Sequence, residues 1–240
     1  MSVLRSIVDQ ALRLSSLRQP ALAVFDLDST VFDLSPRTLE IVRSFIGQSE
    51  HRQLFPQECQ ILAGFANHAK DWGLAEPLER AGFTADQSVV KALRSYWSGK
   101  FFASEFLSHD EPHKGAASFV RQLQSAGTEI LYLSGRDEPN MLEGTLKSLR
   151  NHGFPIDAAG VTLALKPHAA LDDAQFKVDH LAEIAAQTRF AKIWLFENEP
   201  YNINQIAARI PEIEMIFFDS CHSGREQVQV PAARISDFSL

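Results

Sequence analysis

The sequence predicts an α/β protein in which a parallel sheet carries helices on both faces and a helical unit is inserted after the first strand. The first observation is the apolar run Ala21–Phe25, which is typical of a buried parallel strand. The second is that strands and helices alternate after Pro112, which favours a parallel sheet with right-handed crossovers. The third is that residues 34–110 contain helical apolar stripes and almost no β-branched runs. We therefore expect a core domain formed by 1–33 and 111–240, with the inserted unit between them.

Composition and charge are those of an ordinary globular protein. The 240 residues are 45% hydrophobic and 22% charged, and a chain of that length can bury a large core. The net charge of −7 gives no general attraction for nucleic acid or for an anionic membrane surface. No apolar run approaches the length of a membrane span. We therefore predict neither a nucleic-acid nor a membrane partner, and the sequence leaves the oligomeric state open.

The cysteines and the N-terminal segment favour a cytoplasmic location. Cys59 and Cys221 have no CxxC spacing and no neighbouring His/Cys cluster, so we expect two reduced thiols rather than a zinc site or a disulfide. Apolar residues at helical spacing from Leu4 to Leu12 predict an amphipathic helix that packs on the core and is ended by Pro20. A signal peptide would instead show a continuous apolar block and a small-residue cleavage site.

Within the inserted unit, apolar stripes and turn residues predict several short helices. One stripe runs through 39–46, and another through 61–65. Thr84 followed by Gln87 resembles a capping box that opens a helix with its apolar face over 89–97. We expect the aromatic residues of this unit to form its own core rather than a platform for a ligand.

The remaining chain predicts alternating helices and strands. The expected helices are 115–127, 141–152, 176–186 and 203–210, and the expected strands are 129–133, 161–165, 192–196 and 213–218. The carboxyl ends of parallel strands meet at one edge of a sheet, where open α/β sheets bind their ligands. We therefore expect Asp26, Asp28, Ser134–Arg136, Glu197–Asn198 and Asp219 to converge at that edge.

Asp26 and Asp28 are separated by one leucine directly after the first strand. If the strand geometry continues past Asp26, both carboxylates point to the same side of the sheet. Like charges at that distance repel, so a shared proton or a divalent cation must neutralise them. The alternative is a pair of turn or helix-capping aspartates at the end of a strand.

A buried carboxylate at this edge can act as a nucleophile and form an aspartyl-phosphate. In such a reaction Asp26 attacks phosphorus, while Asp28 protonates the leaving alcohol and then activates water. Ser134 offers a hydroxyl group, and Gly135 lets the backbone approach the phosphoryl group closely. Taken alone, Ser134-Gly135 is also an ordinary turn.

A lysine and further oxygen ligands complete such a site. Lys177 is best placed to hold the nucleophile and the phosphoryl group, with Lys166 as the alternative, although either can be a solvated surface lysine. Glu197 and Asn198 offer oxygen ligands of the kind that Mg²⁺ takes. The alternative for Glu197-Asn198-Glu199-Pro200 is the capping of a helix N-terminus.

Four segments together resemble the motifs of the haloacid dehalogenase-like (HAD) superfamily. The segments are Asp26-Leu27-Asp28-Ser29-Thr30, which matches DxDx(T/V), then Leu131-Tyr132-Leu133-Ser134-Gly135-Arg136, Lys177, and Phe196-Glu197-Asn198-Glu199. The resemblance covers roughly 20–33 and 112–220 and implies a Rossmann-like core, with the insertion as a helical C1 cap. It also implies Mg²⁺ held by Asp26, Asp28, Glu197 and Asn198, and phosphate bound by Ser134, Gly135, Arg136 and Lys177.

The second aspartate of the first motif marks phosphatases and phosphotransferases in this superfamily rather than dehalogenases. The resemblance therefore implies a Mg²⁺-dependent phosphatase that acts on a small phosphorylated metabolite. The fourth motif departs from the family pattern, because Glu197-Asn198 stands where paired acids are usual. That departure leaves open which of the two residues binds the metal, and it motivates the alternative of a non-catalytic binding protein. A phosphotransferase or mutase is the alternative of the same class, and a nucleic-acid 3′-phosphatase is disfavoured by the acidic balance.

The cap is expected to close over the site by bending at 34–37 and 108–112, and to determine substrate specificity. The candidate specificity residues are His68, Lys70, Trp72, Arg94, Tyr96 and Lys100. His222 follows the last strand, and we expect it to be structural or solvent-facing rather than a substrate contact.

Overall fold

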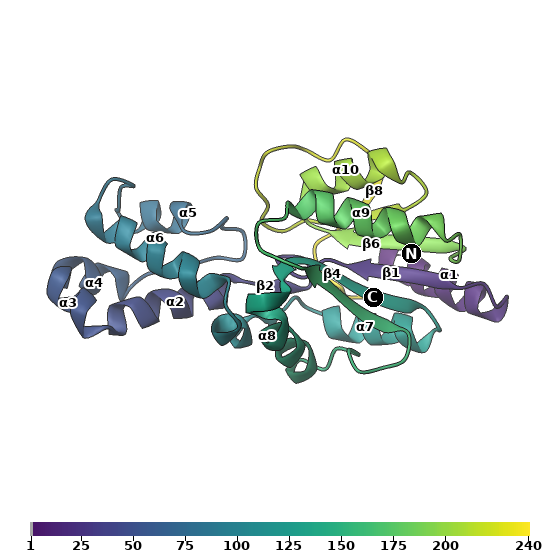
Figure 1. Cartoon of the computed structure of the whole chain (residues 1–240), viewed down its shortest axis with the longest axis horizontal. Helices are drawn as coiled ribbons and strands as arrows, with labels where there is room; N and C mark the ends of the chain where they lie inside the picture. Colours follow the sequence, from purple (N-terminus) through teal and green to yellow (C-terminus); the bar gives the residue numbers. More distant parts are fainter. Residues whose placement is uncertain (1) are drawn as a thin grey trace.

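The computed structural model describes residues 2–240, and its centre is a six-stranded sheet (Figure 1). All neighbouring strands pair in parallel, in the order β5-β4-β1-β6-β7-β8. The strands are β1 Ala21–Phe25, β4 Glu129–Asp137, β5 Val161–Lys166, β6 Lys192–Glu197, β7 Glu214–Phe218 and β8 Ala232–Ile235. The predicted α/β fold is confirmed.

Helices cover both faces of this sheet (Figure 1). One face packs against α1 Val3–Ser16, α7 Ala116–Ser125 and α8 Glu138–Asn151, and the other packs against α9 Asp173–Ala186 and α10 Pro200–Arg209. Alternate side chains of a strand point to opposite faces, so Ala23 and Phe25 enter the first apolar core while Leu22 and Val24 enter the second. The continuous apolar run of β1 is explained by burial on both sides.

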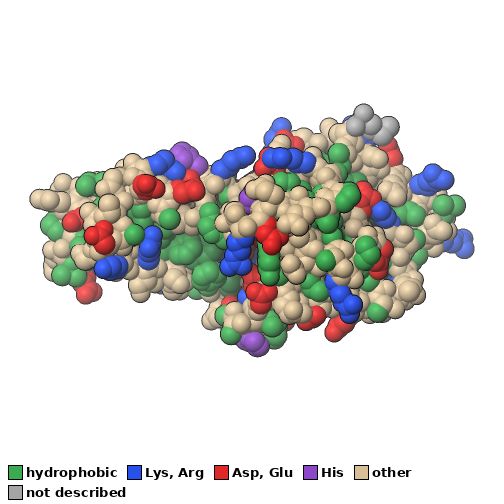
Figure 2. Space-filling model, turned by 90° about the horizontal axis from the view of Figure 1, so that it is seen from above, with side chains coloured by type: hydrophobic (Ala, Val, Ile, Leu, Met, Phe, Trp, Pro, Cys, Tyr) green, Lys and Arg blue, Asp and Glu red, His purple; other side chains and the backbone are tan. Residues whose placement is uncertain are grey.

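The segment between β2 Phe32–Asp33 and β3 Glu111–Pro112 is helical, and we call residues 34–110 the helical unit. It contains α2 Ser35–Gly47, α3 Ser49–Leu54, α4 Pro56–Leu62, α5 Ala75–Arg80, α6 Ser88–Phe101 and the 3₁₀ helix η1 Ser104–His109. It has an apolar core of its own, which includes Val42, Phe45, Leu78 and Leu93. The unit lies beside the sheet (Figure 1), and hydrophobic side chains gather on it next to the junction with the rest of the chain (Figure 2).

The chain enters and leaves the helical unit through β2 and β3, which pair with each other in antiparallel fashion. Phe32 lies opposite Pro112, and Asp33 lies opposite Glu111. A second contact is made where α8 packs against η1: a Cβ at Gly144 would lie 2.6 Å from the backbone oxygen of Ser104. Only glycine permits this close approach of the two segments.

Some boundaries differ from those expected. Thr84 N–H does bond to Gln87 Oε1 (3.0 Å), but Thr84 Oγ1 bonds to Asp86 (2.6 Å), and α6 begins only at Ser88. The predicted helix start at Thr84 is therefore wrong, because this pair closes a turn. β4 continues beyond Ser134, and α8 starts earlier than expected because the Asp137 side chain caps it. Across residues 2–240, no helix has both the length and the apolar character needed to cross a membrane.

Candidate active site

Asp26, Lys177 and Glu197 meet at the carboxyl edge of the sheet. Asp26 follows β1, Glu197 ends β6, and Lys177 lies in the second turn of α9. Lys177 Nζ donates to Asp26 Oδ1 and to Glu197 Oε2, each at 2.6 Å, and all three side chains are buried. Lys177 therefore occupies the position between the two carboxylates that the sequence left open between two lysines.

Lys166, the alternative lysine, has a different role in the structure. Its Nζ donates to the backbone oxygens of Ala169 (3.2 Å) and Leu171 (2.9 Å) and to Asp173 Oδ1 (2.5 Å). Lys166 therefore lines the cavity and holds the loop between β5 and α9, with Asp173 rather than Asp26 as its carboxylate partner.

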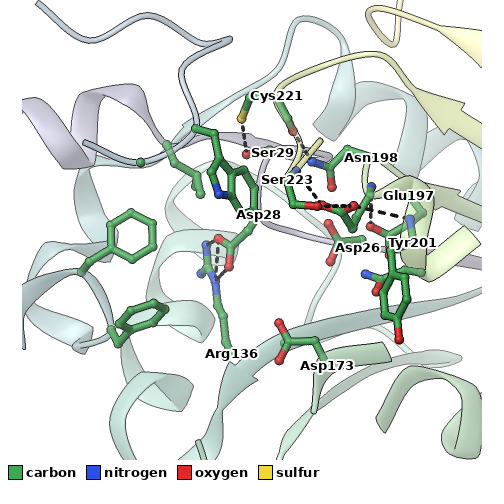
Figure 3. A pocket seen from close by; sticks show the side chains of 18 of the residues that line it. Asp26, Asp28, Ser29, Arg136, Asp173, Glu197, Asn198, Tyr201, Cys221 and Ser223 are labelled. Carbon is green, nitrogen blue, oxygen red and sulfur yellow. Dashed lines mark hydrogen bonds and ion pairs between the residues drawn. The ribbon is translucent and has the colours of Figure 1, made fainter. Parts of the chain in front are cut away.

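Thr30 connects Asp26 to Asn198. Its hydroxyl group lies 2.8 Å from Asp26 Oδ2 and 3.1 Å from Asn198 Oδ1, while Asn198 Nδ2 donates to the backbone oxygen of Cys221 (2.6 Å). Glu197 Oε1 accepts the backbone N–H of Glu199 at 3.0 Å (Figure 3). Both carboxylate oxygens of Glu197 are therefore already bonded, and the Asn198 amide is fixed with its oxygen toward Asp26.

The buried carboxylate of Asp26 carries an unusual charge balance. Burial and the nearby Glu197 carboxylate raise the pKa of Asp26 to about 7, although the Lys177 ammonium opposes this. The pKa of Lys177 is raised by Asp26 and Glu197 despite burial, so the lysine stays charged. Two carboxylates thus share one ammonium group, and an additional cation would complete the neutralisation.

Asp28 belongs to a second group, which we call the ion cluster: Asp28, Arg37, Asp110 and Arg136. Arg136 contacts Asp28 through Nη2 (2.6 Å) and Nε (3.1 Å) (Figure 3). Its Nη2 also lies 2.7 Å from Asp110 Oδ2. Arg37 Nη2 lies 3.2 Å from Asp28, and Arg37 also forms a two-pronged pair with Asp110. Although burial opposes it, the two arginines lower the pKa of Asp28 to about 2. Asp28 is thus ionised, and its carboxylate faces the arginines.

The Ser134-Gly135-Arg136 segment lies at the same edge, within the irregular end of β4. Ser134 is fully buried and its Oγ accepts the backbone N–H of Arg136 (3.3 Å). Gly135 lines the cavity, and a Cβ there would lie 2.5 Å from Asp173 Oδ2. The Arg136 guanidinium is used by the ion cluster and by Thr145 (3.2 Å), so it reaches Asp28 rather than open space.

Asp219 and His222 lie apart from this group. Asp219 pairs with Arg234 of β8 (2.8 Å), and the His222 ring lies 6.2 Å from that of Phe217. Neither is among the described residues that line the cavity. Asp219 does lie at the predicted carboxyl edge, directly after β7, but the neighbouring edge strand holds its carboxylate, so it does not line the cavity.

The donor set fits a magnesium ion only in part. Within residues 2–240, no three His, Cys, Asp or Glu side chains form a group that could hold a metal ion. However, Asp26 Oδ2 and Asn198 Oδ1 both lie within hydrogen-bond distance of one Thr30 hydroxyl. Mg²⁺ commonly takes one or two protein oxygens and keeps several waters. Asp26 and Asn198 suit that pattern, whereas the carboxylates of Asp28 and Glu197 are occupied by their own partners.

A cavity of about 530 Å³ lies between this edge of the sheet and the helical unit. Of the candidate specificity residues, His68 and Trp72 line it, whereas Tyr96 bonds to Ser44 and Lys100 pairs with Glu105. Sequence reasoning gave no role to Thr30, Arg37, Asp110 or Asp173. Thr30 is part of the first motif, although no role was predicted for it. In the sequence, Arg37 and Asp110 look like charged residues of a solvated helix and a linker, so nothing marks them as buried.

No protein-family model and no curated protein matches this chain. Among solved structures, YfnB from Bacillus subtilis, described as a HAD-hydrolase bound to magnesium, aligns at a TM-score of 0.54 and 12% identity over 91% of this chain and 95% of its own. A predicted phosphatase from Clostridium acetobutylicum aligns at a TM-score of 0.52 and 12% identity, over 91% of this chain and 94% of its own. Protein tyrosine kinase A from Mycobacterium tuberculosis aligns at a TM-score of 0.51 and 17% identity, over 90% of this chain and 93% of its own. The chain therefore has the haloacid dehalogenase-like fold.

Proposed function

We propose that this protein is a Mg²⁺-dependent phosphatase that releases inorganic phosphate from a small phosphorylated metabolite through an aspartyl-phosphate at Asp26. The observation that carries the proposal is Lys177, bonded at 2.6 Å to both Asp26 and Glu197 at the carboxyl edge of the sheet. A buried lysine in this position orients the nucleophile and can also attract a phosphoryl group. The HAD-hydrolase and phosphatase neighbours support the same class of reaction.

The reaction has two displacements at phosphorus. An Asp26 oxygen bonds to phosphorus while the ester P–O bond breaks, and the departing alcohol oxygen keeps the electron pair and takes a proton. Water then bonds to phosphorus as the bond to Asp26 breaks, its proton is removed, and inorganic phosphate leaves. Asp26 and Asn198 would hold Mg²⁺, which when bound would offset the negative charge of the phosphoryl group.

Asp28 is the general acid and the general base of the proposed reaction. Its surroundings favour proton removal from water over proton donation to the alcohol. The arginines keep its carboxylate ionised, with a pKa of about 2, so it can accept a proton from water but is a weak base while both arginines face it. Donation of a proton to the alcohol requires Asp28 to be protonated first, and that is favoured only when Arg37 or Arg136 withdraws. Because Arg37 belongs to α2 of the helical unit, closure or opening of the unit as a cap would change this contact.

The first experiment measures phosphate release from p-nitrophenyl phosphate and a panel of phosphometabolites, with Mg²⁺ and with EDTA. Asp26→Asn is compared with the parent and with Asp157→Asn, an exposed aspartate on the surface. Turnover that needs the metal, is lost in Asp26→Asn and is kept in Asp157→Asn supports the proposal. Absence of turnover in a folded protein that still binds Mg²⁺ would favour a non-catalytic binding protein.

Phosphoryl transfer to an alcohol is the second candidate, because one structural neighbour is named a protein tyrosine kinase. The two reactions share the first displacement and differ only in the acceptor of the second. Adding glycerol to the assay separates them: a hydrolase gives equal amounts of phosphate and alcohol product, whereas a phosphotransferase forms glycerol phosphate at the expense of phosphate.

A further inference from the structure

The helical unit presents aromatic side chains to the cavity, and we call Trp72, Trp97, Phe101 and Phe102 the aromatic wall. Trp97 and Phe101 stack with their ring centroids 4.3 Å apart, and the Phe102 ring stands edge-on to both. Trp72 comes from the segment between α4 and α5. Trp72 and Phe102 each leave 52% of their surface exposed.

Packing of the helical unit does not account for this wall. Of its members only Trp97 packs against the apolar core of the unit, and it does so while partly buried. Trp97 is also fixed in orientation, because its Nε1–H donates to Thr38 Oγ1 (3.3 Å). Single exposed apolar residues are common on protein surfaces, but aromatic side chains that together line one cavity are typical of a ligand-binding site. The expectation that the aromatic residues of the unit form only its core is therefore wrong for Trp72 and Phe102.

The wall begins next to the residue that would act on the leaving group. The Arg37 guanidinium carbon lies 4.5 Å from the centroid of Phe101, and Arg37 Nη2 lies 3.2 Å from Asp28 Oδ1. In the proposed reaction the alcohol departs from phosphorus toward Asp28. The wall is thus on the side of the cavity where the non-phosphate part of the substrate would lie.

The charges around the cavity argue against a second phosphate on the substrate. Eight carboxylate residues line the cavity but only four lysines or arginines do. Lys177, Arg136 and Lys166 are each paired with acids of the site. Arg225 is the remaining cation of the lining, and it forms no ion pair with any of residues 2–240. Arg37 and Arg80, which do not line the cavity, neutralise Asp28 and Asp71, yet carboxylates still outnumber cations around it. A second anionic group would therefore be disfavoured away from the metal and Lys177.

Resting on the proposed phosphatase function, we propose that the substrate is a phosphate monoester whose alcohol carries a planar aromatic ring and no second anionic group. The ring stacks on the exposed faces of Trp72 and Phe102, while the ester oxygen faces Asp28. Stacking between rings favours offset or edge-on contact and adds to simple burial of apolar area. This class includes nucleoside monophosphates and phosphorylated aryl-alkyl alcohols.

Two matched pairs of esters test the proposal. 2-Phenylethyl phosphate and 2-cyclohexylethyl phosphate have similar size and similar leaving-group reactivity, but only the first has a planar π-system. We expect kcat/KM to be about 2- to 12-fold higher for the phenyl ester, the range that aromatic pairs produce. A nucleoside 5′-monophosphate should likewise be hydrolysed faster than the corresponding 3′,5′-bisphosphate. Equal kcat/KM values within the first pair would overturn the proposal of a ring, and a faster bisphosphate would overturn the charge argument.

Variants identify the surface responsible. Trp72→Leu combined with Phe102→Leu should bring the ratio of kcat/KM for the phenyl ester to kcat/KM for the cyclohexyl ester to about one. Leu54→Ala is the control, because Leu54 is an exposed apolar residue (63%) of the same unit that does not line the cavity, and it should leave the preference unchanged. A preference that survives the double variant would show that the wall does not bind the ring.

A binding measurement separates failure of this inference from failure of the proposed function. If no ester releases phosphate, the phosphatase proposal fails, and titration calorimetry of the parent with each of the two ethyl esters and Mg²⁺ still tests the ring. Tighter binding of the phenyl ester, lost in the double variant, supports the inference without turnover. Equal affinity, or binding of neither ester, overturns it.

Discussion

Asp110→Asn should be among the most destabilising single changes in this protein. In the ion cluster, Arg37 and Arg136 carry two positive charges, and Asp28 and Asp110 carry two negative charges. The side chains of Arg37, Arg136 and Asp110 have no exposed surface, and only Asp28 is partly exposed, at 32%. The substitution keeps the size of the side chain but leaves two buried positive charges with a single carboxylate, that of Asp28.

Removal of one partner from a buried ion pair typically costs 3–5 kcal/mol of unfolding free energy. Asp28 remains as a partner for both arginines and is in contact with solvent, so we expect a loss near the lower end, about 3 kcal/mol. The control is Asp157→Asn, because Asp157 pairs with Arg150 at the surface with both side chains at least half exposed. An exposed pair of this kind contributes less than about 1 kcal/mol.

Urea unfolding of the parent, both single variants and a double variant measures these free energies. Arg37→Met in the Asp110→Asn background removes the surplus charge while its side chain still packs near Phe101. We therefore expect the double variant to regain stability relative to Asp110→Asn alone. The reasoning is refuted if Asp110→Asn lies within 1 kcal/mol of the parent, or if Arg37→Met adds a further loss.

Three further predictions use other parts of the site and fold. In metal-free protein, the pKa of Asp26 rises from 3.8 to about 7 on folding. The parent should therefore lose unfolding free energy relative to Asp26→Asn as the pH rises from about 4 to 7. Parallel curves of unfolding free energy against pH for the two proteins would contradict this. Lys177→Met should lower kcat for phosphate release by about 100-fold or more at saturating Mg²⁺, and a fall below tenfold would argue against its role. Gly144→Ala places a Cβ against the Ser104 backbone and should lower the free energy of unfolding in urea by about 1–3 kcal/mol. The control Gly99→Ala has open space around it in α6 and should be neutral or stabilising. Equal effects of the two substitutions would show that the contact can relax.

Periodicity predicted most of the fold because burial on two faces leaves a clear signal in the sequence. The strands β1, β6 and β7 are almost wholly apolar, and each is bounded by turn or charged residues. β8 was not predicted, since its sequence, Ala232-Ala233-Arg234-Ile235, has no such run and it pairs only at the sheet edge. Its position depends on β7, which is a tertiary effect that local sequence does not encode.

The centre of the site followed from topology, whereas its partners did not. Parallel strands must place Asp26 and Glu197 at one edge, and Lys177 follows from the helix that precedes β6. The pairing of Arg37 with Asp110 joins two residues far apart in sequence, and nothing in either neighbourhood marks a charge as buried. In the same way, sequence could not separate the exposed Trp72 from aromatic residues that form the core of the helical unit.

The short β2–β3 ribbon allows the helical unit to be replaced as a module without rearrangement of the sheet. Asp33 and Glu111 are cross-strand neighbours, so the segment between them leaves the sheet domain and returns to it at one point. For the sheet domain the helical unit is a single long hairpin loop, and the entropy of closing such a loop rises only slowly with its length. Arg37 and Asp110 lie just inside its two ends and carry opposite charges, so they would be gained or lost together. Such a loop can be lengthened, shortened or exchanged as one module while the strand order and Asp26 remain in place.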